Sequence, residues 1–114
     1  MNLFLFDTSI IIPIHYYFNY LILSEFKFMK EILMYSSQFC PYCVNAERLL
    51  LNKGFKKIKK IMVDENPSYM DEMIKITGEK TVPQIFIGDK HIGGFEQLRL
   101  INNDGNLDKL ILED

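Results

Sequence analysis

The chain has 114 residues, 48% hydrophobic and 25% charged, which is ordinary for one soluble globular domain. Its formal net charge of −2 gives no reason to expect nucleic acid as a partner, because nucleic-acid surfaces are recognised by basic patches. Its 2 cysteines both fall within residues 40–43, which fits a reducing compartment where structural disulfides are rare. We therefore expect a cytoplasmic protein.

Residues 1–28 form an apolar N-terminal extension, which we separate from a domain formed by residues 29–114. The uncharged run 8–24 is at the short limit for a membrane span, which needs about 20 apolar residues. No Lys or Arg precedes this run, which argues against a secretory signal peptide. Three interpretations stay open: untranslated sequence read in frame before Met29, a segment that lies on the domain or is loosely ordered, and a membrane anchor. We expect no membrane association.

The first half of the domain predicts a strand, a helix and a second strand. Residues 31–35 are a short apolar run suited to a buried strand, and residues 58–63 are a second one broken by lysines. Between them, residues 41–52 have helical character and end at Lys53-Gly54. The apolar residues expected on or near one face of this helix are Val44, Leu50 and Leu51.

The second half predicts a helix, a β-hairpin and two more helices. Asn66-Pro67 is a typical helix start and Gly78 a typical helix end. Between them, Met70, Met73, Ile74 and Thr77 recur at helical spacing. The two strands of the hairpin are expected at 84–87 and 91–92. Gly93-Gly94 then leads into a short helix through Leu100. After a loop at 102–105, Asn106 is expected to cap the last helix.

The order of elements is β-α-β-α-β-β-α plus a terminal helix. A βαβ start makes the first two strands parallel, with a right-handed crossover, and the hairpin adds an antiparallel pair. We therefore predict the α/β class, with a four-stranded mixed sheet flanked by helices.

The motif Cys40-Pro41-Tyr42-Cys43 lies where the first strand gives way to the first helix. Proline favours the first helical position, so Cys40 is expected to cap the helix and face its unpaired N–H groups. Such a position can lower a cysteine pKa from about 8.5 to about 3.5–7.5, and the thiolate is the nucleophile. Cys43 falls on the same helical face, so the pair can form a redox-active disulfide in which Cys40 attacks and Cys43 resolves.

Two other uses of the cysteine pair are disfavoured. A structural zinc site wants four ligands, and the chain adds only His15 and His91, so we expect no metal. A purely structural disulfide would close too short a loop to constrain the unfolded chain. A C-x-x-C beside a βαβ pattern is typical of a thioredoxin-like redox motif.

From about Met29 to its end, the chain resembles a bacterial glutaredoxin of the dithiol type. Three separated motifs carry the resemblance: Cys40-Pro41-Tyr42-Cys43, the run 81–87 (TVPQIFI) and Gly93-Gly94-Phe95-Glu96. It implies a thioredoxin-like fold, no tightly bound cofactor, and glutathione as co-substrate. The glutathione-binding residues that it implies are Tyr42, Thr81, Val82, Pro83 in a cis peptide bond, Gly94, Phe95 and Glu96.

The chain departs from the family pattern at three positions. Glu96 stands where Asp usually receives the ammonium of the γ-glutamyl group, and Gln97 where a second acidic residue is common. Ser37 replaces a lysine often found three residues before the first cysteine. Losing that positive charge predicts weaker glutathione binding and a less depressed pKa of Cys40.

The resemblance implies a monomeric, glutathione-dependent thiol–disulfide oxidoreductase that acts on protein disulfides and glutathionylated proteins, with ribonucleotide reductase among the candidate partners. One alternative is a redoxin reduced by thioredoxin reductase, whose members usually lack the Pro-Tyr and Gly-Gly-acidic residues. Another is a carrier of a [2Fe–2S] cluster, whose members typically have one cysteine in a C-G-F-S motif.

Overall fold

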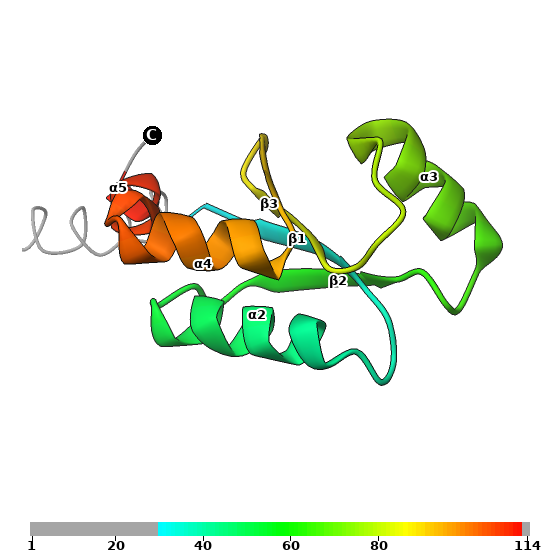
Figure 1. The fold of residues 1–114 in the computed structure, drawn as a ribbon, viewed down its shortest axis with the longest axis horizontal. Coiled ribbons are helices and arrows are strands. Elements are labelled where there is room, and N and C mark those ends of the chain that lie inside the picture. The colour runs from blue at the N-terminus through cyan, green and yellow to red at the C-terminus, as the bar shows by residue number, and fades with distance from the viewer. Residues whose placement is uncertain (1–29, 113–114) are drawn as a thin grey trace, which may run out of the picture.

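The computed structural model describes residues 30–112, so the three interpretations of residues 1–28 lie outside the described residues. The strands and helices of the described chain follow the predicted order (Figure 1). The elements are β1 (Ile32–Ser36), α2 (Pro41–Asn52), β2 (Ile58–Met62), α3 (Pro67–Thr77), β3 (Gln84–Ile87), β4 (Lys90–Gly93), α4 (Phe95–Asn103) and α5 (Asn106–Leu112). None of the helices within residues 30–112 is long and apolar enough to cross a membrane.

The strands form one 4-stranded mixed sheet in the order β2-β1-β3-β4. β1 runs parallel to β2, with Ile32 opposite Ile58, and antiparallel to β3, with Met34 opposite Ile85. β3 and β4 form the antiparallel hairpin. The predicted fold class is therefore confirmed: this is the thioredoxin-like arrangement of a βαβ unit joined to a β-hairpin.

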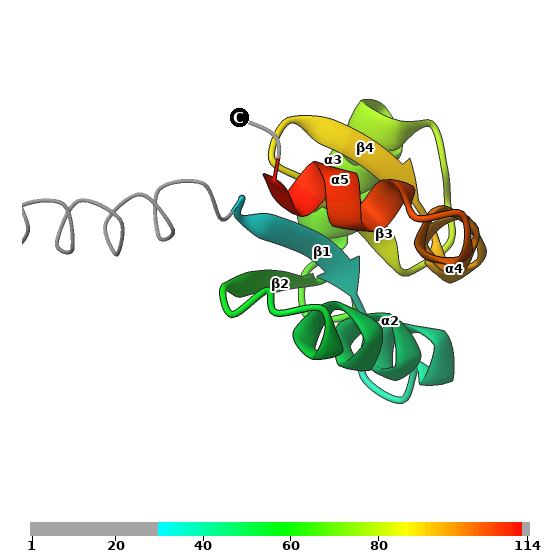
Figure 2. The same cartoon turned by 90° about the vertical axis from the view of Figure 1, so that its left-hand side faces the viewer.

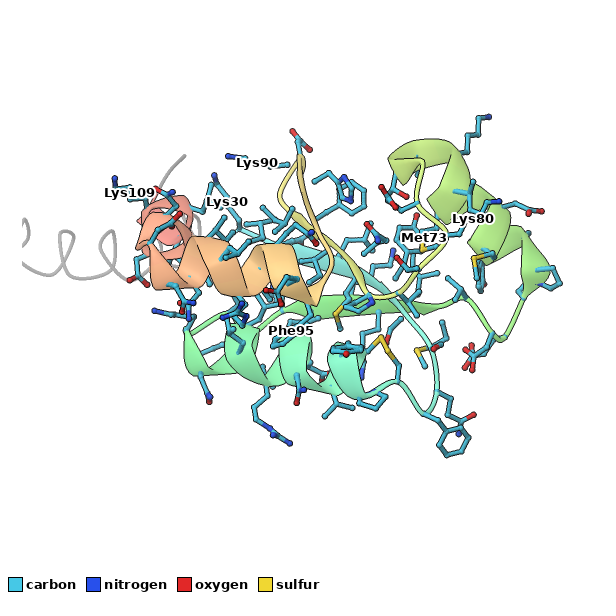
Figure 3. The ribbon with its side chains drawn as sticks, viewed as in Figure 1. Lys30, Met73, Lys80, Lys90, Phe95 and Lys109 are labelled. Atoms are coloured by element: carbon cyan, nitrogen blue, oxygen red, sulfur yellow. A yellow bond between two sulfur atoms is a disulfide. The ribbon has the colours of Figure 1, made fainter. Side chains whose placement is uncertain are left out.

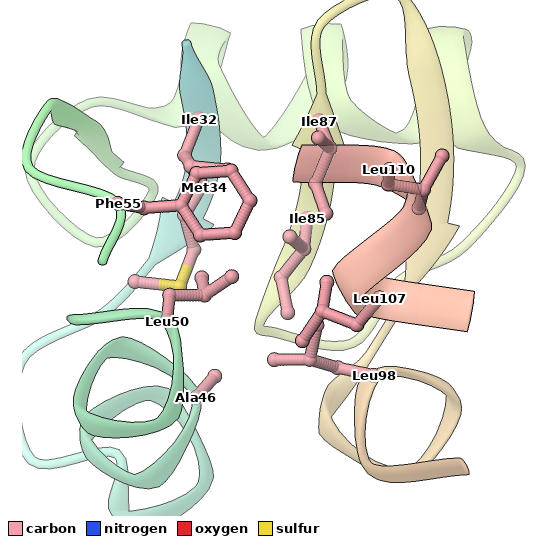
Figure 4. Close-up of a cluster of buried hydrophobic side chains, with 10 residues drawn as sticks. All are labelled: Ile32, Met34, Ala46, Leu50, Phe55, Ile85, Ile87, Leu98, Leu107 and Leu110. Carbon is pink, nitrogen blue, oxygen red and sulfur yellow. The ribbon is translucent and has the colours of Figure 1, made fainter. Parts of the chain in front are cut away.

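Helices cover both faces of the sheet (Figures 1 and 2). Because successive side chains of a strand point to opposite faces, Ile32 and Met34 of β1 lie on the face covered by α2, α4 and α5. They pack there with side chains from those helices, as Figure 4 shows. The cluster comprises Ile32, Met34, Ala46, Leu50, Phe55, Ile85, Ile87, Leu98, Leu107 and Leu110.

The other face of the sheet packs against α3. Tyr35 and Val63 form a smaller buried cluster there with Met73, which lies on the side of α3 that faces the sheet (Figure 3). Tyr35 also meets Phe86 edge to face, with ring centroids 6.3 Å apart. Burial of its hydroxyl raises the pKa of Tyr35, and the nearby Glu72 carboxylate raises it further.

The predicted boundaries of α3 are confirmed by its caps. Asn66 has an extended backbone, and its side-chain oxygen accepts a hydrogen bond from the N–H of Ser68 at 3.0 Å, ahead of Pro67. Gly78 ends the helix in the left-handed region, at φ 74°.

The predicted buried face of α2 was wrong in part. Cys43, Ala46 and Leu50 are buried, whereas Val44 and Leu51 are about half exposed. The buried residues follow the three- and four-residue spacing of one helical stripe, and Val44 and Leu51 lie one residue beyond it.

The chain after the hairpin also differs from the prediction. The helix α4 continues to Asn103, well past Leu100, because Leu98 and Ile101 pack on the main cluster and extend its buried stripe. Asn106 begins α5 instead of capping it: the side chain of Asp104 accepts a hydrogen bond from the Asn106 N–H at 3.0 Å. The first strand runs one residue later than predicted, to Ser36.

Candidate active site

The first cysteine lies at the N-terminus of α2. Cys40 is the N-cap, with an extended backbone at φ −112° and ψ 103°, and Pro41 follows as the first helical residue. The N–H of Cys43 donates a hydrogen bond to the Cys40 Sγ at 3.2 Å. This sulfur thus takes the place of a capping oxygen, facing N–H groups and the positive end of the helix dipole. Both features stabilise a thiolate at Cys40.

The two cysteines are joined by a disulfide, with their Cα atoms 5.2 Å apart. They differ in access: Cys40 is half-buried, whereas Cys43 is only 3% exposed. An incoming disulfide can therefore reach the Cys40 sulfur, and Cys43 is placed to attack that same sulfur from within the protein.

The loop before β3 faces the first cysteine. The carbonyl oxygen of Val82 lies 3.9 Å from the Cys40 Sγ, and the Val82–Pro83 peptide bond is cis, as predicted. This proximity follows from the sheet: β1 ends near Cys40, and its antiparallel neighbour β3 begins just after Pro83. The end of one strand and the start of the other meet at the same edge.

All seven residues expected to bind glutathione line one groove, together with Gln97. Tyr42 comes from α2, and its ring centroid lies 6.3 Å from that of Phe95 at the start of α4. Figure 3 shows Phe95 between the start of α4 and α2. The groove has a volume of about 400 Å³ and is lined by Tyr42, Thr81, Val82, Pro83, Gly94, Phe95, Glu96 and Gln97.

One member of the groove is already paired with a cation. Both side-chain oxygens of Glu96 accept hydrogen bonds from the Arg99 guanidinium, one of them from Nε at 3.3 Å. These hydrogen bonds lower the pKa of Glu96, and the same contact raises the pKa of Arg99. The sequence analysis missed Arg99, although the three-residue spacing on one helix was a visible signal.

Gln97 has a structural role that the sequence analysis also missed. Its side-chain oxygen accepts a hydrogen bond from the Gly94 N–H at 2.9 Å and so fixes the start of α4. This side chain lies close over Gly93, which has φ 116°: a Cβ added there would be 3.1 Å from both the Cγ and the Oε1 of Gln97. Gly93 is therefore required by its backbone conformation and by its neighbour.

A buried amide supports the loop that faces Cys40. Gln84, only 2% exposed, donates a hydrogen bond to the carbonyl of Thr81 at 3.0 Å. Its oxygen accepts one from the His91 Nε2 at 2.8 Å, and the His91 ring lies against Phe86 at a centroid distance of 4.9 Å. The contact fixes the proton of His91 on Nε2, because an amide oxygen can only accept. No sequence signal pointed to this pair.

The loop before Cys40 lacks the lysine of the family pattern. Ser37 is half-buried, and the neighbouring Gln38 N–H donates a hydrogen bond to the Asp64 carboxylate at 3.0 Å. An anionic group, not a cation, thus anchors this loop. Among residues 30–112, no three His, Cys, Asp or Glu side chains gather as metal ligands would.

A helix-capping cysteine, a buried partner cysteine and a thioredoxin-like fold define a thiol–disulfide oxidoreductase. Residues 32–92 match the family model described as glutaredoxin. The chain is 45% identical over 83 residues to a glutaredoxin of Neisseria meningitidis, covering 73% of this chain and 98% of that protein. It is 41% identical over 83 residues to glutaredoxin 3 of Escherichia coli, covering 73% and 99%. The chain belongs to the glutaredoxin family.

Solved structures agree with this assignment. The solution structure of glutaredoxin from Brucella melitensis superposes with a TM-score of 0.65 at 37% identity, covering 74% of this chain and 90% of that one. The crystal structure of a buckwheat glutaredoxin–glutathione complex superposes with a TM-score of 0.66 at 28% identity, covering 72% and 76%. The protein is thus a glutaredoxin oxidoreductase by sequence and by fold.

Proposed function

We propose that the protein uses glutathione to reduce protein disulfides and glutathione mixed disulfides, with Cys40 as nucleophile and Cys43 as resolving thiol. The observation that carries the proposal is the Cys40 sulfur, which caps α2 and remains accessible while its partner is buried. Glutathione as the reductant is supported by the groove beside Cys40 and by the similarity to the buckwheat protein solved with glutathione.

The dithiol reaction runs in two exchanges. The Cys40 thiolate attacks one sulfur of a substrate disulfide, the substrate S–S bond breaks, and the departing thiolate takes up a proton. The Cys43 thiolate then attacks the Cys40 sulfur, releases the second substrate thiol, and leaves the Cys40–Cys43 disulfide. Two glutathione molecules reduce this disulfide in turn and leave as glutathione disulfide, so two electrons pass from glutathione to substrate.

We expect the parts of glutathione to bind along the groove in a definite order. The carbonyl oxygen of Val82 lies 3.9 Å from the Cys40 Sγ. The backbone N–H and C=O of Val82 would pair with the backbone around the glutathione cysteine, as an added strand does. The N-terminus of α4 would receive the γ-glutamyl carboxylate, and Glu96 its ammonium. Because Arg99 holds Glu96, binding of the ammonium must compete with this ion pair.

The setting of the reaction follows from the same assignment. We propose a cytoplasmic monomer that acts on disulfide-bearing or glutathionylated proteins, with residues 29–114 as the catalytic domain. Ribonucleotide reductase is one candidate substrate because its turnover forms a protein disulfide that a dithiol can reduce.

Two cysteine variants test the division of roles. Cys43→Ser keeps the nucleophile and should retain deglutathionylation of a small mixed disulfide, because glutathione can release the Cys40 adduct without help. It should lose reduction of a protein disulfide by at least about a hundredfold, since the mixed disulfide has no internal resolving thiol. Cys40→Ser should lose both reactions.

The measurement is NADPH consumption coupled through glutathione reductase, with wild-type protein and Cys43→Ser assayed on both substrates. Turnover of either substrate by Cys40→Ser would contradict the roles. Turnover that needs thioredoxin reductase and ignores glutathione would contradict glutathione as the reductant.

A further inference from the structure

The residue before the nucleophile is exposed in an unusual way. Phe39 has 93% of its surface exposed, more than any other large hydrophobic residue between 30 and 112. Its backbone is in the left-handed region, at φ 58°, the one non-glycine residue of the described chain with a positive φ. Bulky side chains rarely adopt this conformation, which Asn and Gly tolerate better. Neither feature stabilises the folded chain, so the ring is not held there by packing.

The loop that carries Phe39 is fixed in place. Its neighbour Gln38 is tied to the Asp64 carboxylate through the backbone N–H at 3.0 Å, and Cys40 begins the helix α2 on the other side. The backbone of Phe39 is therefore held next to Cys40, and its ring projects into solvent. It does not line the groove that holds the residues expected to bind glutathione.

The covalent step brings any polypeptide substrate to this ring. A disulfide between Cys40 and a substrate cysteine holds their Cα atoms about 4.4–6.8 Å apart. The Cα of Phe39 is about 3.8 Å from that of Cys40, and the substrate's own neighbouring residues follow at about 3.8 Å steps. The side chains next to the substrate cysteine thus come within reach of the Phe39 ring. The segment from Phe39 to Tyr42 bears no charge, so apolar neighbours fit it best.

We propose that Phe39 is a docking residue for polypeptide substrates, which contacts apolar side chains next to the cysteine that bonds to Cys40. This inference rests on the proposed role of Cys40 as nucleophile. It assigns to the protein two recognition elements: a groove for glutathione and, outside the lining of that groove, an aromatic contact for the protein substrate.

Two peptide disulfides distinguish the contribution of the Phe39 contact from the intrinsic reactivity of Cys40. Each peptide carries one cysteine joined to 2-nitro-5-thiobenzoate; the cysteine has leucine neighbours in one peptide and glycine neighbours in the other. The Cys40 thiolate attacks the peptide sulfur, because the nitrothiobenzoate is the better leaving group, and it departs with the electron pair of the broken S–S bond. Cys43 then displaces the peptide thiol. Stopped-flow absorbance of the released nitrothiobenzoate, with fully reduced full-length protein, gives the rate of the first step.

The variant to compare is Phe39→Asn, which removes the ring but suits the left-handed backbone. Wild-type protein should react about five- to tenfold faster with the leucine peptide than with the glycine peptide, as burial of apolar surface predicts. Phe39→Asn should lose this preference and keep the glycine-peptide rate, and Phe39→Tyr should restore the preference. Leu51→Ala, which truncates a half-exposed leucine in the last turn of α2, is the matched control and should behave as wild type.

Three outcomes of these rate measurements would contradict the docking role of Phe39 or the function on which it rests. An equal leucine preference in wild type and Phe39→Asn, or no preference in wild type, overturns the docking role. The docking role is also overturned if Phe39→Asn releases nitrothiobenzoate more slowly from both peptides and its Cys40 is alkylated more slowly by iodoacetamide. The ring would then act on the reactivity of Cys40 itself. Failure of wild-type Cys40 to react with either peptide overturns the proposed function as well, whereas loss of the preference alone leaves that function standing.

Discussion

At the scale of single residues, the site depends on how charge is arranged around one sulfur. The Cys40 sulfur faces N–H groups of α2, yet the loop before it carries Ser37 and is anchored by the Asp64 carboxylate. A cation at position 37 would stabilise both the thiolate and the carboxylate of a bound glutathione. The thiolate is therefore stabilised by the N-terminus of α2, and this electrostatic effect falls off within one turn of the helix.

Ser37→Lys should restore the missing charge. We expect a lower pKa of Cys40 than in wild type and a KM for glutathione that falls by about 1.5- to fivefold, the range of an exposed ion pair. The pKa is measured from the rate of iodoacetamide alkylation against pH. Ser37→Gln, which adds length without charge, is the control. Identical titrations for the Lys and Gln variants would show that this position does not act on the sulfur through charge.

At the scale of elements, the ends of helices are the features that the local sequence predicts best. The boundaries of α3 follow from Asn66-Pro67 and Gly78, and the start of α2 from Cys40-Pro41, because caps act within a few residues of chain. The extent of α4 could not be read in this way. Its last turn forms because Ile101 finds apolar partners across the fold, which no local pattern reveals.

The same limit explains which site residues were missed. The three motifs gave every residue of the groove except Gln97, whose role depends on how its side chain folds back over Gly93. The pairing of Gln84 with His91 joins β3 to β4 through side chains at a position of irregular register, between Ile85 and Phe86. Contacts of this kind depend on the register, which the turn and packing decide together.

Gly93→Ala should disturb the junction between β4 and α4. The substitution forces a Cβ into a backbone at φ 116° and to 3.1 Å from the Gln97 side chain. We expect the free energy of unfolding to fall by about 1–3 kcal/mol. The KM for glutathione should rise, because Gln97 must move. Urea denaturation and the glutathione-coupled assay measure the two effects.

Gly105→Ala is the matched control, since Gly105 also has a positive φ, of 85°, but nothing within 4 Å of an added Cβ. It should cost less stability than Gly93→Ala and leave the KM for glutathione unchanged. If both variants lost the same stability, the contact with Gln97 would contribute nothing.

At the scale of the whole molecule, the sheet topology gathers the three motifs at one edge. β1 ends next to the cysteine motif, its antiparallel neighbour β3 begins next to Pro83, and β4 returns to end at Gly93, opposite Ile85 (Figure 2). Segments about 40 and 50 residues further along the chain than the cysteine motif thus meet beside it, where residues from all three motifs line one groove. Packing on both faces of the sheet holds this edge rigid, because α2, α4 and α5 cover one face and α3 covers the other.

Within the described residues, the two clusters already bury both faces of the sheet with side chains between Ile32 and Leu110, and we predict that residues 29–114 fold and react without residues 1–28. A chain beginning at Met29 should melt within about 4 °C of the full chain, the shift that about 1 kcal/mol gives a domain of this size. It should also keep the full chain's rate of Cys40 alkylation and its glutathione-coupled turnover. Calorimetry and the two assays compare the chains.

Leu98→Ala in the chain beginning at Met29 is a control, which tests that the comparison of melting temperatures can detect a destabilised core. Leu98 is fully buried in the main cluster, and its truncation should cost about 2–5 kcal/mol, which melting reports directly. If removal of residues 1–28 lowered the melting temperature as much as Leu98→Ala does, or slowed alkylation of Cys40, the boundary at residue 29 would be wrong. The extension would then belong to the folded domain, because a segment without contacts to the domain cannot change its stability to that extent.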